Sequence, residues 1–196
     1  MNTRGWWLLF LSIAAWGADK DKRFRAEAAD TYATKQAHAG LTIAVVPYHT
    51  AEKMKSAFGK LNLSEYGVLP VLMVMKNDTG KTLRLADMAV DYVTPERFKV
   101  EATPSSEVQY LQGPKRPDFG GRPFPNPLPQ RKKTNKLASY EIEGFAFNAK
   151  MLPAGESAHG FVYFQTNYQR GSMIYVRGIV EAQSGKELFY FEIPTE

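Results

Sequence analysis

The stretch from Val68 to Asn77 constrains the fold of this chain more than any other part of the sequence. It reads VLPVLMVMKN, so both alternating sets of its side chains are mainly apolar. Successive side chains of a strand point to opposite faces of a sheet, and a sheet with one face in water needs only one apolar set. The run therefore predicts a strand that is covered on both faces.

Shorter apolar runs with turn signals about every ten residues surround this strand. Leu41–Tyr48 reads LTIAVVPY and predicts a strand, with Pro47 at its end or on a sheet edge. In the stretch 140–147 the apolar set changes parity at Gly144, which predicts a β-bulge. Further strands are expected over 82–85, 88–92, 97–102, 160–165, 173–182 and 188–193, with a turn over 183–186 closing a terminal hairpin.

One helix is expected, over about 50–61. Thr50 can cap its first turn, and Gly59 weakens its last turn. Its apolar positions follow the helical spacing i, i+3, i+4, i+7 at Met54, Ala57, Phe58 and Leu61. About eight short strands and one helix predict a mainly β chain, an antiparallel immunoglobulin-like β-sandwich.

The N-terminus has the pattern of a secretory signal peptide over residues 1–17. Arg4 precedes an apolar run from Trp6 to Trp16, and small residues at Ala15 and Gly17 suit cleavage after Gly17. An uncleaved membrane anchor is the alternative, although a spanning helix needs about 20 apolar residues. We therefore expect an exported protein, periplasmic or extracellular, whose mature chain has no transmembrane segment.

The mature chain divides into a polar segment, 18–40, and a β-sandwich domain, 41–196, with a loop insertion at 104–138. The chain has no cysteine, which excludes disulfides, thiolate metal sites, cysteine nucleophiles and lipid attachment to a cysteine. A chain of 196 residues is long enough to bury a core without such cross-links.

The insertion, called here the basic tract (104–138), is rich in proline and in positive charge. Proline has no N–H to donate, so closely spaced prolines exclude a helix or a central strand and leave an extended loop. The prolines are 104, 114, 117, 123, 125, 127 and 129. Seven basic residues stand against two acidic ones, so the basic tract accounts for the net charge of +5 while the remaining chain is close to neutral.

Three interpretations of the basic tract are open. It covers a sheet edge, it is a connector without a partner, or it docks a partner such as an anionic glycan, a lipid head group, a cell-wall polymer or a groove that reads polyproline II. For docking, the predicted anion contacts are Arg122, Arg131, Lys132 and Lys133, and Phe124 is the predicted hydrophobic anchor. Nucleic acid is not expected, because no nucleic-acid-binding motif is present.

The sequence contains only weak candidates for catalytic or metal-binding motifs. There is no G-x-S-x-G elbow, H-E-x-x-H motif or EF-hand loop, so no cofactor, metal or catalytic residue is predicted. Glu141 and Glu143 would lie on one strand face at about the carboxylate spacing of inverting glycosidases, but such alternation is common on solvated strands. Asn62 and Asn77 are formal glycosylation acceptors, and the segment from Asn77 to Gly80 predicts a turn.

Three segments carry a resemblance to a known group of proteins. The run Tyr66–Asn77 resembles the first core strand of uncharacterised exported bacterial proteins, as do Met151–Phe164 and Gly185–Pro194. The L-P-x-G-x-S portion with its following strand is similar to a strand–turn–strand of extracellular immunoglobulin-like domains of unknown function. The resemblance covers 40–194 and implies no activity, and the insertion after Thr103 departs from it.

Together these features predict an exported, non-enzymatic binding or structural module, envelope-associated or adhesive. Its expected partner is an envelope protein or an anionic polymer. The alternatives are a hydrolase whose site is assembled in space, a binder of anionic glycan or lipid through the basic tract, and an accessory subunit with an exposed apolar patch.

Overall fold

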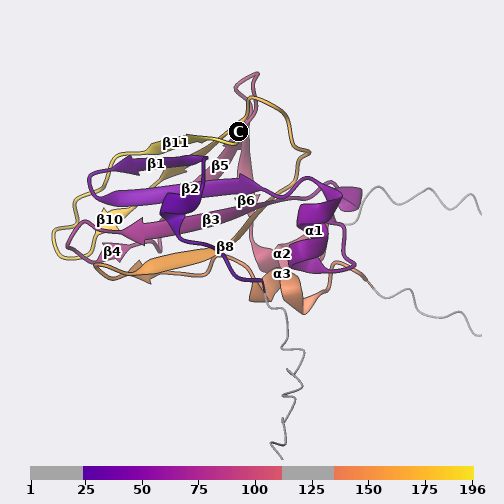
Figure 1. Ribbon diagram of the computed structural model, residues 1–196, viewed down its shortest axis with the longest axis horizontal. Coiled ribbons are helices and arrows are strands. Elements are labelled where there is room, and N and C mark those ends of the chain that lie inside the picture. Colours follow the sequence, from indigo (N-terminus) through magenta and orange to yellow (C-terminus); the bar gives the residue numbers. More distant parts are fainter. Residues whose placement is uncertain (1–23, 112–134) are drawn as a thin grey trace, which may run out of the picture.

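The computed structural model describes residues 24–111 and 135–196 (Figure 1). The signal peptide expected over 1–17 lies outside these residues. Within them, neighbouring strands form an antiparallel eight-stranded sheet in the order β1 (Lys35–His38), β2 (Leu41–Pro47), β3 (Leu69–Asn77), β8 (Ser157–Phe164), β6 (Lys99–Thr103), β5 (Ala89–Val93), β9 (Met173–Arg177) and β11 (Phe191–Pro194).

A small antiparallel sheet and short helices complete the described fold. The small sheet has the order β10 (Val180–Glu181), β4 (Leu83–Arg84) and β7 (Met151–Leu152). The helices are α1 (Ala51–Phe58), α2 (Ser105–Val108) and α3 (Tyr140–Gly144), with 3-10 turns η1 (Ala29–Thr31) and η2 (Leu63–Tyr66). None of the helices in these two ranges is long and apolar enough to cross a membrane.

The eight-stranded sheet curls until its first and last strands meet. The backbone N–H of Glu192 in β11 donates to the side-chain oxygen of Gln36 in β1 at 2.8 Å. The rings of His38 and Phe191 lie 6.3 Å apart across the same seam. The chain is therefore mainly β and antiparallel as predicted. Its strands form a nearly closed, barrel-like sheet, and the expected two-sheet immunoglobulin-like sandwich is not confirmed.

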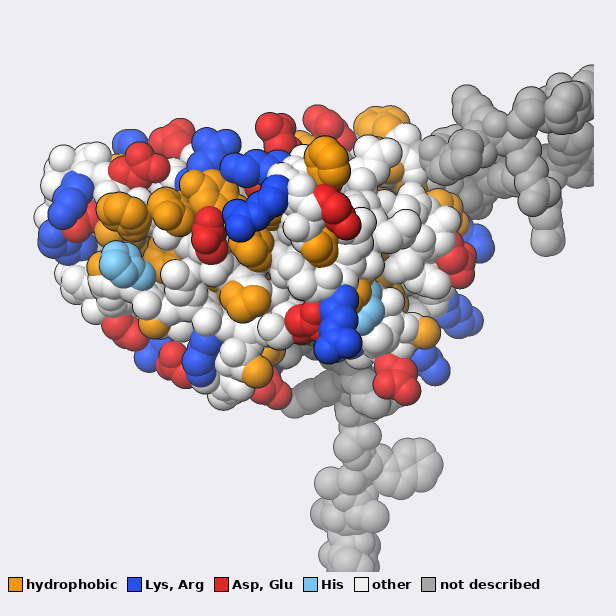
Figure 2. Space-filling model, turned by 90° about the horizontal axis from the view of Figure 1, so that it is seen from above, with side chains coloured by type: hydrophobic (Ala, Val, Ile, Leu, Met, Phe, Trp, Pro, Cys, Tyr) orange, Lys and Arg blue, Asp and Glu red, His pale blue; other side chains and the backbone are white. Residues whose placement is uncertain are grey.

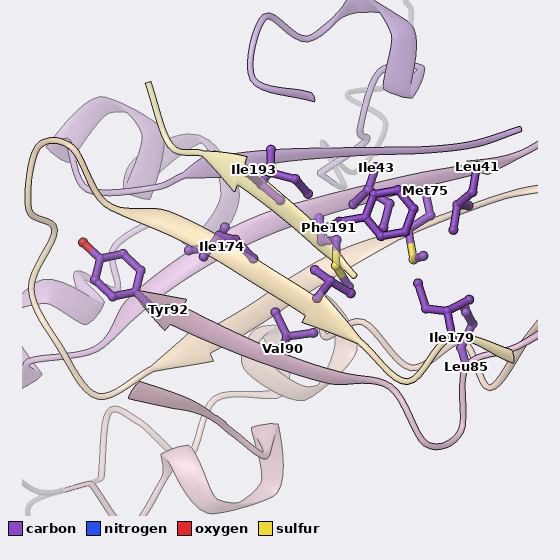
Figure 3. Close-up of a cluster of buried hydrophobic side chains, with 14 of the residues drawn as sticks. Leu41, Ile43, Met75, Leu85, Val90, Tyr92, Ile174, Ile179, Phe191 and Ile193 are labelled. Atoms are coloured by element: carbon purple, nitrogen blue, oxygen red, sulfur yellow. The ribbon is translucent and has the colours of Figure 1, made fainter. Parts of the chain in front are cut away.

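Strand β3 contributes to a separate core on each side. Its side chains at Leu69, Val71, Met73 and Met75 belong to the cluster enclosed by the curled sheet. Figure 3 shows this cluster, with Met75 beside side chains that reach inward from β2, β5, β9 and β11. The alternate side chains, including Leu72 and Val74, pack in a second cluster with the helices and the N-terminal segment. The predicted burial of both faces is confirmed.

Helix α1 is present where the sequence predicts it. The backbone N–H of Lys53 donates to the Thr50 hydroxyl at 3.3 Å, and Gly59 ends the helix with a φ of 62°. Met54, Ala57 and Phe58 are buried in the second cluster. The helix ends at Phe58, three residues before the expected Leu61.

The strand expected over 140–147, with a bulge at Gly144, is wrong. Residues 140–144 form α3, because Ile142, Phe145 and Ala146 also fit the helical spacing i, i+3, i+4 and all three pack into the second cluster. The Tyr163 hydroxyl donates to the Ile142 carbonyl at 2.7 Å, which holds α3 against β8. A local apolar pattern of this length fits either period, and tertiary packing decides between them.

The terminal hairpin expected over 173–193 is also interrupted. β9 ends at Arg177, and Gly178 follows with a φ of 79° and a position where an added Cβ would meet the Asp87 carbonyl at 2.4 Å. The chain then pairs briefly with β4 through β10 before returning as β11. The other predicted strands are present with ends shifted by a few residues.

Gly160 lets the segment after α3 cross closely over β8. A Cβ at Gly160 would lie 2.5 Å from the backbone of Phe147. The same crossing is held by the N–H of Phe147, which donates to the Phe161 carbonyl at 2.9 Å, and by the N–H of Phe161, which donates to the Phe145 carbonyl at 2.7 Å. Any side chain at position 160 must displace this backbone.

We expect Gly160→Ala to lower the free energy of unfolding by about 1–3 kcal/mol, because the added methyl overpacks a backbone crossing. Gly144→Ala is the matched control. An added Cβ there meets nothing within 4 Å, and alanine favours helix, so stability should stay the same or rise by up to about 1 kcal/mol. Urea denaturation of both variants measures the difference in stability. Equal denaturation midpoints for the two variants would contradict the close backbone crossing at Gly160.

Candidate binding surface

The site residues predicted from the sequence, Arg122, Phe124, Arg131, Lys132 and Lys133, lie outside the described residues. Their contacts and the three interpretations of the basic tract stay predictions.

The structure places the two flanks of the basic tract. The side-chain amide of Asn135 donates to the Gln109 carbonyl at 2.7 Å, and Val108 and Leu137 are both buried in the second cluster. The described ends of the tract, 104–111 and 135–138, therefore pack beside α3. The extended loop expected over the whole tract is wrong for Ser105–Val108, which form α2 because the closely spaced prolines come only after them.

The carboxylate pair considered for glycoside hydrolysis does not have the expected geometry. Glu141 and Glu143 lie in α3, so the two-residue rise of a strand does not separate them. A hydrogen bond from the Ser139 hydroxyl holds the pKa of Glu141 below its ordinary value. The expected carboxylate spacing rested on a strand, so in α3 this pair gives no support to the hydrolase alternative.

Asn77 has a structural role that excludes one of the two formal glycosylation sites in the folded protein. It is fully buried, and its side-chain nitrogen donates to the carbonyls of Lys81, Leu152 and Pro153 at 2.7, 2.9 and 3.0 Å. Its side-chain oxygen accepts from the Thr79 N–H and hydroxyl, which confirms the predicted turn. In ranges 24–111 and 135–196, no group of three or more His, Asp or Glu side chains has a metal-binding arrangement.

The groups with large pKa shifts are tyrosines of the second core. Burial, together with Tyr32 and Glu27 nearby, raises the pKa of Tyr48 to about 12. Burial alone raises the pKa of Tyr163, whose hydroxyl is already bonded to Ile142. Tyr48 packs edge-on against Phe161 at 4.8 Å, so these shifts follow from packing.

Aromatic side chains instead gather around β9, the end of β1 and the segment that leads into β11. We define the aromatic strip as His38, Tyr175, Phe189 and Tyr190. Ring centroids lie 5.3 Å apart for Tyr175 and Tyr190, 5.5 Å for Tyr190 and Phe189, and 6.2 Å for Phe189 and His38. Phe189 and Tyr190 are 69% and 46% exposed. Figure 2 shows this side of the molecule, with hydrophobic side chains interspersed among charged ones.

The aromatic strip differs from the outer face of β2, β3 and β8 on the same sheet. There, Leu72, Val74 and Phe161 are covered by helices and by the N-terminal segment. The side chains that the helices bury belong to this second cluster, which contains no residue of β9 or β11. Contiguous exposed apolar side chains on a folded protein commonly mark an interaction surface.

A groove of about 390 Å³ runs beside the aromatic strip. Its lining residues come from the β5–β6 hairpin, β9 and β11: Val93, Arg97, Lys99, Met173, Tyr175, Tyr190 and Glu192. The Lys99 ammonium lies 4.6 Å from the centre of the Tyr175 ring, a cation–π contact. In the described part of the chain, the side chains of Arg97 and Glu192 have no ion-pair partner.

The hairpin tip holds Arg97 in a strained backbone conformation. Its φ is 70°, a region that costs a residue with a Cβ about 1–2 kcal/mol. The hairpin fixes it there, because the N–H of Arg97 donates to the Thr94 carbonyl and the N–H of Thr94 donates to the Phe98 carbonyl, both at 2.9 Å. Ala39 has a positive φ of 49° at the β1–β2 hairpin, so this conformation belongs to the turn.

Sequence reasoning missed this surface because it took 188–193 only as the last strand of a terminal hairpin and did not ask which of its side chains face outward. The signal was present: Phe189, Tyr190 and Phe191 are consecutive aromatic residues, and both alternating sets cannot point into one core. Phe191 is buried, while its two aromatic neighbours are exposed.

Comparisons with known proteins identify no relative from which a function can be transferred. No family model and no curated protein matches the chain. A lipoprotein candidate from Bacillus subtilis aligns over 83% of this chain with 14% identity and a TM-score of 0.38, and the chain spans 38% of its length. A functionally unknown protein from Listeria monocytogenes aligns over 85% of this chain and 86% of its own, with 12% identity and a TM-score of 0.34. Both scores are too low to assign a fold or a function.

We expect Arg97→Gly to leave the free energy of unfolding unchanged or to raise it by up to about 1 kcal/mol, because glycine adopts a positive φ without strain. Glu96→Gly, one residue earlier and outside the positive-φ region, is the control and should lower it by about 0.5–1 kcal/mol. Thermal or urea unfolding tests both, and a clear loss of stability for Arg97→Gly would show that position 97 is not strained.

Proposed function

We propose that this chain is an exported, non-enzymatic binding module that holds a partner of the cell envelope through the aromatic strip. The N-terminal pattern of residues 1–17 supports export. The observation that carries the proposal is the row of exposed rings on one face of an otherwise well-packed sheet. The immunoglobulin-like plan implied by the sequence resemblance stays a hypothesis within this proposal.

The sheet makes the strip a preorganised surface. β9 pairs with β5 on one side and β11 on the other, and its inward side chains Ile174 and Val176 are fully buried. Tyr175 alternates with them, so its position is fixed by the same strand. Rigid aromatic groups lose little conformational entropy on binding, and tyrosine is enriched among residues that dominate interface energy.

The basic tract is a second candidate, favoured by its concentration of positive charge and by its anchored flanks. Contacts from Arg131, Lys132 and Lys133 would be screened by salt, whereas stacking on the strip would not. Salt dependence therefore separates the two surfaces.

The test is retention of the mature protein on purified cell envelope across a salt series. We expect the double variant Phe189→Ser, Tyr190→Ser to lose at least about tenfold in affinity, because it removes two exposed rings of the strip. Tyr140→Ser is the matched control, since Tyr140 is 84% exposed in α3, outside both the aromatic strip and the basic tract. Its retention should be unchanged.

The triple variant Arg131→Gln, Lys132→Gln, Lys133→Gln tests the second candidate. If the basic tract binds, this variant has a shallower salt dependence than the unaltered protein. Full retention of the Phe189, Tyr190 double variant would overturn the role of the strip.

A further inference from the structure

We propose that the aromatic strip and its groove bind an acidic polysaccharide, with sugar rings stacked on the aromatic side chains and sugar carboxylates beside Arg97 and Lys99. This inference rests on the proposed function and names the chemistry of its partner.

The arrangement of the rings suits a chain of sugar units. Tyr175, Tyr190 and Phe189 follow one another at centroid spacings of 5.3 and 5.5 Å, with successive planes inclined by 37° and 39°. A pyranose ring has one face of C–H groups and a rim of hydroxyls, so it packs its apolar face on an aromatic ring and leaves its polar rim available. A row of rings at short intervals offers such contacts to successive units.

The charged groups lie where they can contact the polar groups at the rim of a stacked sugar ring. Lys99 is held over the Tyr175 ring and covers that ring face, so sugar units would stack on Tyr190 and Phe189 with a carboxylate beside the Lys99 ammonium. Arg97 lines the same groove and offers a planar fork of donors that matches a carboxylate. Both cations lack an ion-pair partner among the described residues.

The remaining charged groups of this face are consistent with an acidic ligand. Glu192 also lines the groove, and its carboxylate accepts hydrogen bonds only, so it suits sugar hydroxyls. Arg177 is paired with the buried Asp91 at 3.9 Å and is therefore not counted as available. The groove thus has two cations against one carboxylate.

The dimensions favour a polysaccharide over a folded protein partner. A stable protein interface buries about 800 Å² on each side around a desolvated apolar centre. Here the groove has a volume of about 390 Å³ and is lined in part by Arg97, Lys99 and Glu192. The aromatic rings of the strip lie beside it. An extended polymer can follow this line without covering a wide surface.

The experiment uses the mature protein with immobilised polymers that separate sugar rings from charge. The probes are two polyuronates, polygalacturonate and alginate, a neutral galactan, and polyglutamate, which has carboxylates without sugar rings. We expect binding to at least one polyuronate, at least about tenfold weaker binding to galactan, and no measurable binding to polyglutamate.

Two variants and one control assign the binding to the surface. Lys99→Gln keeps the rings and should remove most of the preference for polyuronate over galactan. The Phe189→Ser, Tyr190→Ser double variant should lose at least tenfold on every sugar polymer that binds. Tyr140→Ser should behave like the unaltered protein in each case.

The outcomes distinguish the two proposals. Equal binding of polyglutamate and polyuronate would overturn the inference, because the rings would then contribute nothing. Failure of both polyuronates to bind would overturn it as well. If the double variant still loses its retention on envelope in that case, the aromatic strip binds the envelope as proposed, but its ligand is not an acidic polysaccharide. If the double variant keeps both envelope and polyuronate binding, both proposals are wrong.

Discussion

Burial of β3 on both faces is the constraint on which the other parts of the structure depend. Leu72 and Val74 point to one side while Met73 and Met75 point to the other, so each side needs its own cover. Each fully buried side chain of this size contributes roughly 1.5–3 kcal/mol relative to exposure. The curled sheet encloses one set, and the helices with the N-terminal segment enclose the other (Figure 1). Both covers are needed to keep the side chains of β3 away from water.

This division explains why the outer face of the sheet has two halves with different properties. The half over β2, β3 and β8 is an interior, where Phe161 and Tyr163 pack under the helices. The half over β9 and β11 has its apolar set turned inward, toward the cluster of Figure 3. Its outward rings, Tyr175 and Tyr190, therefore add nothing to the enclosed core. The proposed binding role would explain why these rings lie on the surface.

Sequence reasoning recovered the features that local pattern determines and missed those that depend on distant contacts. The double apolar pattern of β3 and the cap at Thr50 were sufficient to predict a doubly covered strand and helix α1. The segment 140–147 fitted either strand or helix, and only its packing against Tyr163 decides for helix. The curling of the sheet depends on contacts such as Gln36 to Glu192, 156 residues apart, which no local pattern encodes. The aromatic strip shares this property in part: Phe189 and Tyr190 are neighbours in the sequence, but only the fold brings Tyr175 and His38 beside them.

Hydroxyl-radical footprinting of the aromatic side chains, with and without purified envelope, tests the central claim most directly. In the free protein, Phe189 and Tyr190 should be oxidised readily, while Phe161 and Tyr163 on the covered half of the same sheet should stay unlabelled. With envelope present, oxidation of Phe189 and Tyr190 should fall and that of Tyr140 should not change. Ready oxidation of Phe161 and Tyr163 in the free protein, or no protection of Phe189 and Tyr190 on the envelope, would contradict the division between a covered and a binding half.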